Sequence, residues 1–290
     1  MSDRNAGTLY LCATPIGNLS DISERVLETL RSVDVIAAED TRNSIKLLNH
    51  FDIKKPLTSY HEYNRYDKAN ELIDMMRQGA DVAVITDAGT PAISDPGQVL
   101  ADMCHAAGIT VTALPGPCAL ITALAMSGID SRRFVFEGFL PPDKKERRQI
   151  LGMLEDEMRT VVVYEAPHHL LATLEQLYEH LGDRNIAVCR ELTKKFEEVK
   201  RMRLCEAIGF YKANEPRGEF VLVIEGRSSE ELMKEKEDKF RAMDLEEHMS
   251  MYESQGMDHK EAMKMVAADR GVSKRDIYNQ LIIESNGRSN

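Results

Sequence analysis

Between residues 8 and 226 the sequence alternates short apolar runs, typical of strands, with longer stretches of helical periodicity. The expected strands lie at residues 8–13, 33–37, 81–86, 109–113, 134–137, 160–164, 185–190 and 219–225. A helix is expected between most of them, the first with Ser20 as its N-cap. Because strands that alternate with helices usually pair in parallel, the pattern predicts α/β domains with largely parallel sheets, at residues 1–117 and 118–227.

The sequence changes character after Gly226. Residues 228–239 are mostly charged, and no strand pattern follows them. Asp258 and Glu261 have the spacing of a helix-capping box, and Gly271 separates the helix they begin from a second one opened by Ser273. Two short helices joined by such a turn have helix-turn-helix dimensions. Residues 228–290 are therefore expected to form a small helical appendage, either a nucleic-acid contact or a plain cap.

Composition limits the classes of protein that fit. The net charge of −11 argues against a binder that relies on a positive field over the whole molecule, although a local basic groove remains compatible with it. No apolar run approaches the roughly 20 residues of a membrane span, and the N-terminus lacks a signal-peptide pattern. The five cysteines are scattered without a C-x-x-C pair, which predicts free thiols, a reducing cytoplasmic setting and no metal site.

Three loops rich in Gly and Pro directly follow expected strands, at residues 14–18, 87–97 and 114–119. Ligands of open α/β sheets bind beyond the carboxyl ends of strands, and glycine there lets a ligand approach the backbone. The loops therefore predict a preformed pocket that reads its ligand through main-chain groups. The chain has neither a G-x-G-x-x-G pattern after the first strand nor a P-loop, so a dinucleotide or a nucleoside triphosphate is a poor candidate.

Seven stretches occur in an order that resembles a known family. They are LCATPIGNLSDIS, AAEDTRNS, ITDAGTPAISDPG, LPGPCA, VVYEAPHH, CRELTKKFEE and RGEFVLVIEG. Together they resemble the tetrapyrrole-methylase-type (class III) methyltransferases, and within them the branch of bacterial 16S ribosomal RNA (cytidine-2′-O)-methyltransferases. The resemblance implies two α/β domains with S-adenosylmethionine in the cleft between them, usually in a homodimer. It also implies 16S ribosomal RNA, within the small ribosomal subunit, as the substrate.

The resemblance also implies which residues bind the cofactor. Carried over to this sequence they are Pro15, Ile16, Gly17, Asp87, Gly89, Thr90, Pro91, Ile93, Pro115, Gly116, Cys118, Ala119 and Tyr164. Related sequences often have Ser where this chain has Cys118. If the hydroxyl binds the cofactor, the thiol would do so more weakly and leave backbone N–H groups to act.

Methyl transfer from a sulfonium to a hydroxyl is an in-line displacement that needs no metal. The enzyme has to align the reacting atoms, and a base near the hydroxyl should help. Glu39, Asp40 and Arg42 follow the second expected strand and offer two carboxylates and a guanidinium, so we expect them to be catalytic. The alternative is a helix start, with Asp40 as N-cap and Arg42 in surface ion pairs. Glu165 and His168 are secondary candidates for the base.

Several basic residues are candidate contacts for RNA phosphates. Arg190 and Lys194 follow a later strand, Lys144 and Lys145 form a cluster with Arg147 and Arg148, and Lys274 and Arg275 lie on the last helix. The alternative for each is solvated surface. Two other functions remain open: a methyltransferase that acts on a tetrapyrrole, another small molecule or a protein side chain, and a ligand-sensing regulator whose appendage binds DNA.

Overall fold

The computed structural model describes residues 6–287 of the protein. Its contacts divide the chain into two compact units. The first holds two sheets and runs to residue 225, apart from residues 155–158, which group with the helices that follow residue 226. The expected domain limits at residues 117 and 227 stay predictions.

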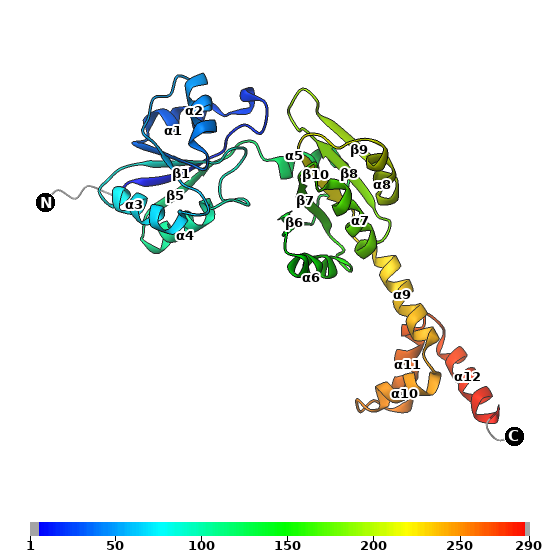
Figure 1. Ribbon diagram of the computed structural model, residues 1–290. Helices are drawn as coiled ribbons and strands as arrows, with labels where there is room; N and C mark the ends of the chain where they lie inside the picture. Colours follow the sequence, from blue (N-terminus) through cyan, green and yellow to red (C-terminus); the bar gives the residue numbers. More distant parts are fainter. Residues whose placement is uncertain (1–5, 288–290) are drawn as a thin grey trace. The chain divides into compact units, whose positions relative to one another are not determined.

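The two halves of the first unit, each built on one sheet, are called here the first and the second lobe. The first lobe contains a parallel sheet with the strand order β3-β2-β4-β1-β5. Its strands are β1 (Thr8–Cys12), β2 (Val35–Ala38), β3 (Leu57–Ser59), β4 (Val82–Ile85) and β5 (Thr110–Leu114). Its helices are η1 (Leu19–Asp21), α1 (Glu24–Ser32), α2 (Thr41–His50), α3 (Arg65–Arg77) and α4 (Gly97–Ala106). Apolar side chains of α1 and α2 cover one face of the sheet and those of α3 and α4 cover the other (Figure 1).

The first helix begins later than the sequence indicates. Ser20 lies inside the short helix η1, where its N–H donates to the side chain of Asn18. Ser23 is the N-cap of α1, and its hydroxyl accepts from the N–H of Val26. The prediction of Ser20 was wrong because a hydroxyl before an apolar stretch also fits a turn that precedes the helix.

The second lobe contains a mixed sheet with the order β6-β7-β10-β8-β9. Its strands are β6 (Phe134–Phe139), β7 (Thr160–Glu165), β8 (Asn185–Arg190), β9 (Glu198–Arg203) and β10 (Phe220–Ile224). Only the β6–β7 pair is parallel within the described sheet, so the expectation of a largely parallel sheet is wrong for this lobe. For β8 and β9 the reason is that the connection between Arg190 and Glu198 is too short for the crossover that parallel strands need. The strand β10 is antiparallel to both of its neighbours as well.

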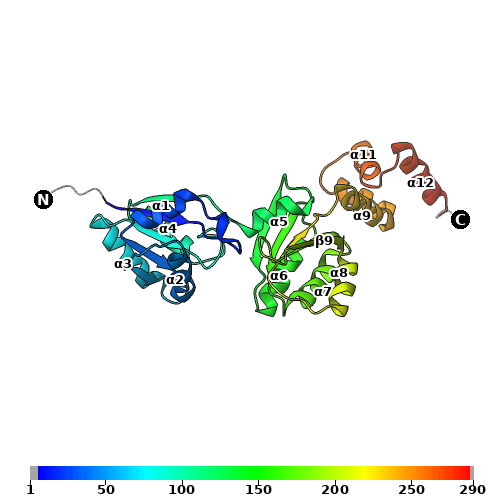
Figure 2. The ribbon, with the colours of Figure 1, turned by 90° about the horizontal axis from the view of Figure 1, so that it is seen from above.

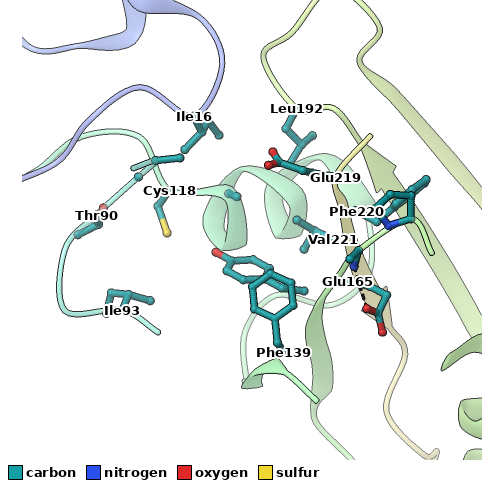
Figure 3. Close-up of a pocket in the computed structure, with 16 residues that line it drawn as sticks. Ile16, Thr90, Ile93, Cys118, Phe139, Glu165, Leu192, Glu219, Phe220 and Val221 are labelled. Atoms are coloured by element: carbon teal, nitrogen blue, oxygen red, sulfur yellow. Dashed lines mark hydrogen bonds between the residues drawn. The ribbon is translucent and has the colours of Figure 1, made fainter. Parts of the chain in front are cut away.

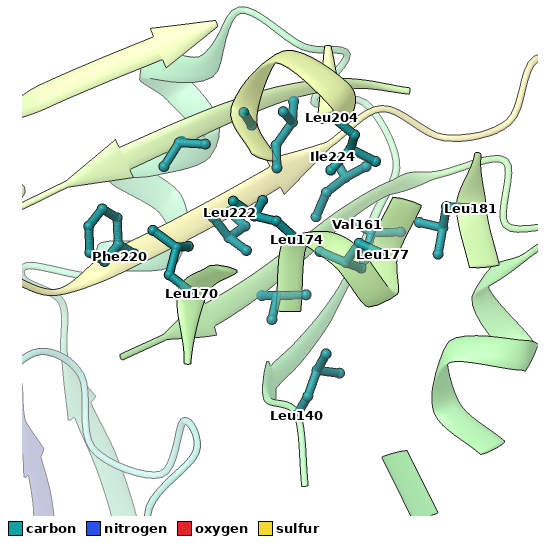
Figure 4. Close-up of a cluster of buried hydrophobic side chains, with 14 of the residues drawn as sticks. Leu140, Val161, Leu170, Leu174, Leu177, Leu181, Leu204, Phe220, Leu222 and Ile224 are labelled. Carbon is teal, nitrogen blue, oxygen red and sulfur yellow. The ribbon is translucent and has the colours of Figure 1, made fainter. Parts of the chain in front are cut away.

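Helices cover both faces of this second sheet. They are α5 (Ala119–Ser127), α6 (Lys144–Leu154), α7 (Leu170–Leu181) and α8 (Leu204–Ala213). Leucines of α7 pack with Phe220, Leu222 and Ile224 of β10 in the core of one face (Figure 4). On the other face Leu120 and Leu124 of α5 pack against Val162 and Val221 (α5 is seen from above in Figure 2).

The direction of β10 matters for the site. Because β10 is antiparallel to β7 and β8, its first residue lies at the edge where those two strands end. Phe220 pairs with Glu165 on one side and with Arg190 on the other. The start of β10 and the ends of β7 and β8 therefore lie at the same edge of the second sheet.

The second unit is helical, as expected. Its described helices are α9 (Ser229–Ala242), α10 (Leu245–Glu253), α11 (His259–Asp269) and α12 (Lys274–Gly287). The capping box at Asp258 and Glu261 is confirmed, and Ile277 of α12 is fully buried against α11. The unit also contains α10, whose His248 accepts a hydrogen bond from Arg270 and contacts Asp269. The helical unit is therefore larger than the expected pair of helices. Within residues 6–287 no helix is long and apolar enough to cross a membrane.

Candidate functional site

A cavity of about 450 Å³ lies at the ends of strands from both lobes. The first lobe lines it with Ile16, Ala88, Gly89, Thr90 and Ile93. The second lines it with Cys118, Ala119, Phe139, Tyr164, Glu165, Ala166, Pro167, Leu192, Glu219, Phe220 and Val221. In Figure 3 the residues of the two lobes face each other, with Cys118 and Phe139 between them. We call this the first cavity; most of its lining side chains are apolar.

The three Gly/Pro loops are tied to one another by short contacts. The N–H and C=O groups of Thr14 and Gly89 pair at 2.8 and 3.1 Å, and Gly89 has a left-handed φ of 91° that favours glycine. The hydroxyl of Thr90 donates to the carbonyl of Pro117 at 3.0 Å. A Cβ on Gly116 would lie 2.7 Å from the Cβ of Ala13. The backbone that surrounds the cavity is therefore held in shape before any ligand arrives.

Tyr164, at the end of β7, joins the cavity wall to the start of α5. Its hydroxyl accepts from the N–H of Leu120 at 3.0 Å, and its ring packs edge-on against Phe136 and Phe139. Burial raises its pKa to about 12, so the phenol is neutral at physiological pH. Cys118 is the N-cap of α5 but, among the described residues, its thiol makes no capping hydrogen bond.

A second cavity, also of about 450 Å³, adjoins the first. Its lining residues are Pro15, Ile16, Gly17, Leu19, Asn43, Ser44, Lys46, Leu47, His50, Thr86, Asp87, Ala88, Lys194 and Glu219. Ile16, Ala88 and Glu219 line both cavities. The two cavities thus share a wall at the ends of β1, β4 and the start of β10.

The expected cofactor residues divide between these cavities. Ile16, Gly89, Thr90, Ile93, Cys118, Ala119 and Tyr164 line the first. Pro15, Gly17 and Asp87 line the second. Pro91, Pro115 and Gly116 line neither of the two. The Asp87 carboxylate accepts from the N–H of Asp40 at 3.2 Å and from the side chain of Asn43 at 3.3 Å, so it fastens the start of α2 to the end of β4.

Glu39, Asp40 and Arg42 take different roles at the start of α2. Asp40 is the N-cap: its carboxylate accepts from the N–H of Arg42 and pairs with the Arg42 guanidinium at 2.7 Å. That side-chain hydrogen bond lowers the pKa of Asp40 to about 2. This geometry matches the alternative interpretation of a helix start. Glu39 instead accepts from the hydroxyl of Thr86 at 3.2 Å, and burial, aided by the charge of Asp87, raises its pKa.

The expected cationic contacts also differ in their surroundings. Lys194 pairs with Glu191 at 3.0 Å and Glu219 at 2.8 Å beside the second cavity. Burial opposes the charge of Lys194, but these two hydrogen bonds outweigh it and raise its pKa. Arg190 lies near Glu198, with 3.8 Å between Nε and Oε2.

The other expected cations are not among the residues that line the two cavities. Lys144 and Lys145 are exposed at the start of α6, whereas Arg147 of the same cluster turns inward and donates to Gln176 and Thr173 at 2.6 Å each. Lys274 donates to the carbonyl of Lys260 at 2.8 Å, and Arg275 is exposed on α12.

Glu165 lines the first cavity, but other groups hold its carboxylate. It accepts from the hydroxyl of Thr173 and from the N–H of Ala166, and it lies 3.9 Å from the guanidinium of Arg147. Its side chain is 5% exposed. These contacts make Glu165 a support for the turn after β7, and they leave Glu39 as the stronger candidate for the base.

Sequence reasoning missed several cavity residues of the second lobe. Leu192 follows β8, Phe139 ends β6, and Glu219 and Val221 lie at the start of β10. The rule that sites lie beyond the carboxyl ends of parallel strands does not find the start of an antiparallel strand. The turn after β8 has left-handed backbone at Glu191 and Thr193, a conformation that the sequence does not reveal.

Comparison with known proteins shows the family to which the chain belongs. The family model of tetrapyrrole (corrin/porphyrin) methylases matches residues 8–208. A solved structure of uroporphyrin-III C-methyltransferase from Thermus thermophilus is similar over 76% of this chain and 94% of that one, with a TM-score of 0.55 and 20% identity, which shows the shared fold. The chain belongs to the tetrapyrrole methylase family and is a methyltransferase.

Curated relatives narrow the position within this family. Two proteins named ribosomal RNA small subunit methyltransferase I are each 46% identical to this chain over 273 residues. The protein from Halalkalibacterium halodurans matches over 94% of both chains, and the one from Bacillus subtilis over 94% of this chain and 93% of its own. The resemblance inferred from the seven sequence stretches is thereby confirmed, and so is the predicted fold class.

Proposed function

We propose that this methyltransferase transfers the methyl group of S-adenosylmethionine to the ribose 2′-hydroxyl of a cytidine in 16S ribosomal RNA. The observation that carries the proposal is the similarity to ribosomal RNA small subunit methyltransferase I along nearly the whole of both chains. The 46% identity to the protein from Halalkalibacterium halodurans extends over the cavity loops and the helical appendage together. The uroporphyrin-III C-methyltransferase, at 20% identity, shares only the fold.

The first cavity suits the proposed cofactor. Its volume falls within the usual range of about 300–1,000 Å³ for small-molecule sites. Among the described residues that line it none is basic, which suits a ligand with a cationic sulfonium. The residues that would hold the cofactor are Ile16, Gly89, Thr90, Ile93, Cys118, Ala119 and Tyr164. When bound, S-adenosylmethionine supplies a methyl group activated for in-line displacement.

The residues at the start of α2 accept the proton of the ribose hydroxyl and bind the neighbouring phosphate. Glu39 accepts the proton of the ribose hydroxyl; burial raises its pKa and so strengthens it as a base. Asp40 is a weak base with a pKa of about 2, and it instead holds the guanidinium of Arg42. Arg42, whose side chain is 87% exposed, binds a phosphate next to the target ribose.

Several basic residues contact the RNA backbone. Lys144 and Lys145 on α6, Lys274 and Arg275 on α12, Arg190 at the end of β8, and Lys194 in the lining of the second cavity are the candidates for phosphates. The small ribosomal subunit in the cytoplasm is the proposed substrate, and the enzyme acts as a homodimer.

The proposal is tested by methyl transfer to small ribosomal subunits from cells that lack the gene. Purified enzyme with labelled S-adenosylmethionine should label the 16S RNA, and mass spectrometry of its nucleosides should find 2′-O-methylcytidine. Label on another nucleoside would refute the cytidine assignment. Label only on added tetrapyrroles, or on ribosomal protein, would refute RNA as the substrate. Calorimetry with S-adenosylmethionine in the presence of a chelator tests the cofactor separately.

A further inference from the structure

The second cavity differs in chemistry from the first, although they share a wall. Lys46, His50 and Lys194 contribute basic groups to it, and Asp87 and Glu219 contribute carboxylates, whereas the described lining of the first cavity contains no basic residue. Basic side chains suit a ligand that carries phosphate, because a cation nearby offsets its charge. Lys194 is held by Glu191 and Glu219, which leaves Lys46, exposed on α2, as the candidate cation for a phosphate.

Helix α2, labelled in Figure 1, lines this cavity with both apolar and polar side chains. Leu47 of α2 and Leu19 of η1 offer apolar contact, and Leu19 is 40% exposed although it is a large hydrophobic residue. Asn43 and His50 lie on the same helix and present an amide and an imidazole. Enzymes that hold a base turned out of its strand contact its plane with aromatic or apolar side chains and its edge with polar groups.

The position of the second cavity also matches a methyl acceptor. Ile16, Ala88 and Glu219 separate it from the first cavity, so ligands in the two cavities meet at this wall. Thr86 lines the second cavity and donates to the carboxylate of Glu39 at 3.2 Å. The candidate base Glu39, which lines neither cavity itself, is thereby bonded to a residue of the second cavity's lining.

From this arrangement we infer that the second cavity binds a single RNA nucleotide turned out of its strand. Leu19 and Leu47 contact the plane of its base, Asn43 and His50 bind the base edge, and Lys46 binds a flanking phosphate. The ribose then points toward the shared wall and Glu39. This inference rests on the proposed function and adds to it the binding residues on α2, which no motif at a strand end indicates.

The test compares Asn43→Ala and His50→Ala with Asn49→Ala. Asn49 is an exposed asparagine of the same helix that does not line the cavity. Asn43→Ala also removes a bond to Asp87. His50→Ala complements it because the His50 ring makes no hydrogen bond within residues 6–287 and packs edge-on against Phe51. For each variant the KM for small ribosomal subunits and the Kd for S-adenosylmethionine are measured at one fixed salt concentration.

The KM for the subunits should rise about tenfold in Asn43→Ala and His50→Ala, the usual scale for losing a specific base contact. Their Kd for S-adenosylmethionine should stay within about twofold of wild type, and Asn49→Ala should match wild type in both. A raised cofactor Kd with an unchanged KM would instead assign the second cavity to the cofactor, and no change in either would remove it as a ligand site. Failure of the wild-type enzyme to methylate the subunits would overturn the proposed function itself, and this inference with it.

Discussion

Replacing Tyr164 by Phe should loosen the start of α5 and weaken cofactor binding. The hydroxyl of Tyr164 accepts from the N–H of Leu120, which is only 7% exposed, so Phe would leave this amide without its partner and with little access to water. An unsatisfied buried donor costs about 1–3 kcal/mol. With about 1.4 kcal/mol for each factor of ten, the Leu120 amide should exchange its hydrogen about 5 to 140 times faster.

Hydrogen exchange followed by NMR measures this effect at the residue concerned, and calorimetry measures the affinity for S-adenosylmethionine. The affinity should fall, because Cys118 and Ala119 at the same helix start line the first cavity. Tyr178→Phe is the matched control, since Tyr178 is 42% exposed on α7. If Leu120 exchanged at the same rate in wild type, Tyr164→Phe and the control, the hydroxyl would have no part in holding α5.

Three further predictions address the base, the alkaline limit of stability and the appendage. Glu39→Gln should lower turnover in the methylation assay about 10²-fold with unchanged cofactor affinity. Asp40→Asn keeps an oxygen that can cap α2 and should remain active in the same assay. Equal losses of turnover in the two variants would contradict their separate roles. Burial raises the pKa of Tyr60 from 10.0 to about 12, so the fold favours its neutral form. The stability that Tyr60 contributes in this way is complete below pH 10 and is lost as the pH rises toward 12. Urea unfolding should show the free energy of unfolding decline over this range, and decline less in Tyr60→Phe. Identical declines in the two proteins would refute Tyr60 as the cause. Replacing Lys274 and Arg275 together by Ala should weaken RNA binding and make it less salt-dependent in filter-binding assays, without changing cofactor affinity. Unchanged RNA affinity at matched salt would favour a plain structural cap.

Much of the first lobe could be predicted because its signals are local. The apolar runs at β1, β2, β4 and β5 and the three loops that follow strands are visible in a few consecutive residues each. The capping box of α11 is equally local, since its two side chains bond to backbone groups three residues away. In contrast, β3 has only three residues, too few to show a periodic pattern.

The two possible roles of the residues before α2 illustrate where sequence reasoning stops. A carboxylate at Asp40 fits both a helix cap and a catalytic group, and Glu39 next to it has the same chemistry. Only the packed structure separates them, because it places Arg42 on Asp40 and brings Thr86, from the neighbouring strand, to Glu39. Their pKa values consequently shift in opposite directions.

The sequence by itself determined the alternation of elements, the family and the loops of the first lobe that surround the first cavity. The tertiary structure alone decided the rest of the site. The antiparallel direction of β10 brings Glu219 and Val221 to the edge where β7 and β8 end, and the packing of α2 beside β4 opens the second cavity at Asn43. Helix periodicity and caps arise between residues a few positions apart, so they can be recognised in the sequence. Strand order and direction depend instead on which distant segments bury their apolar faces together, and the spacing of residues along the chain does not express that choice.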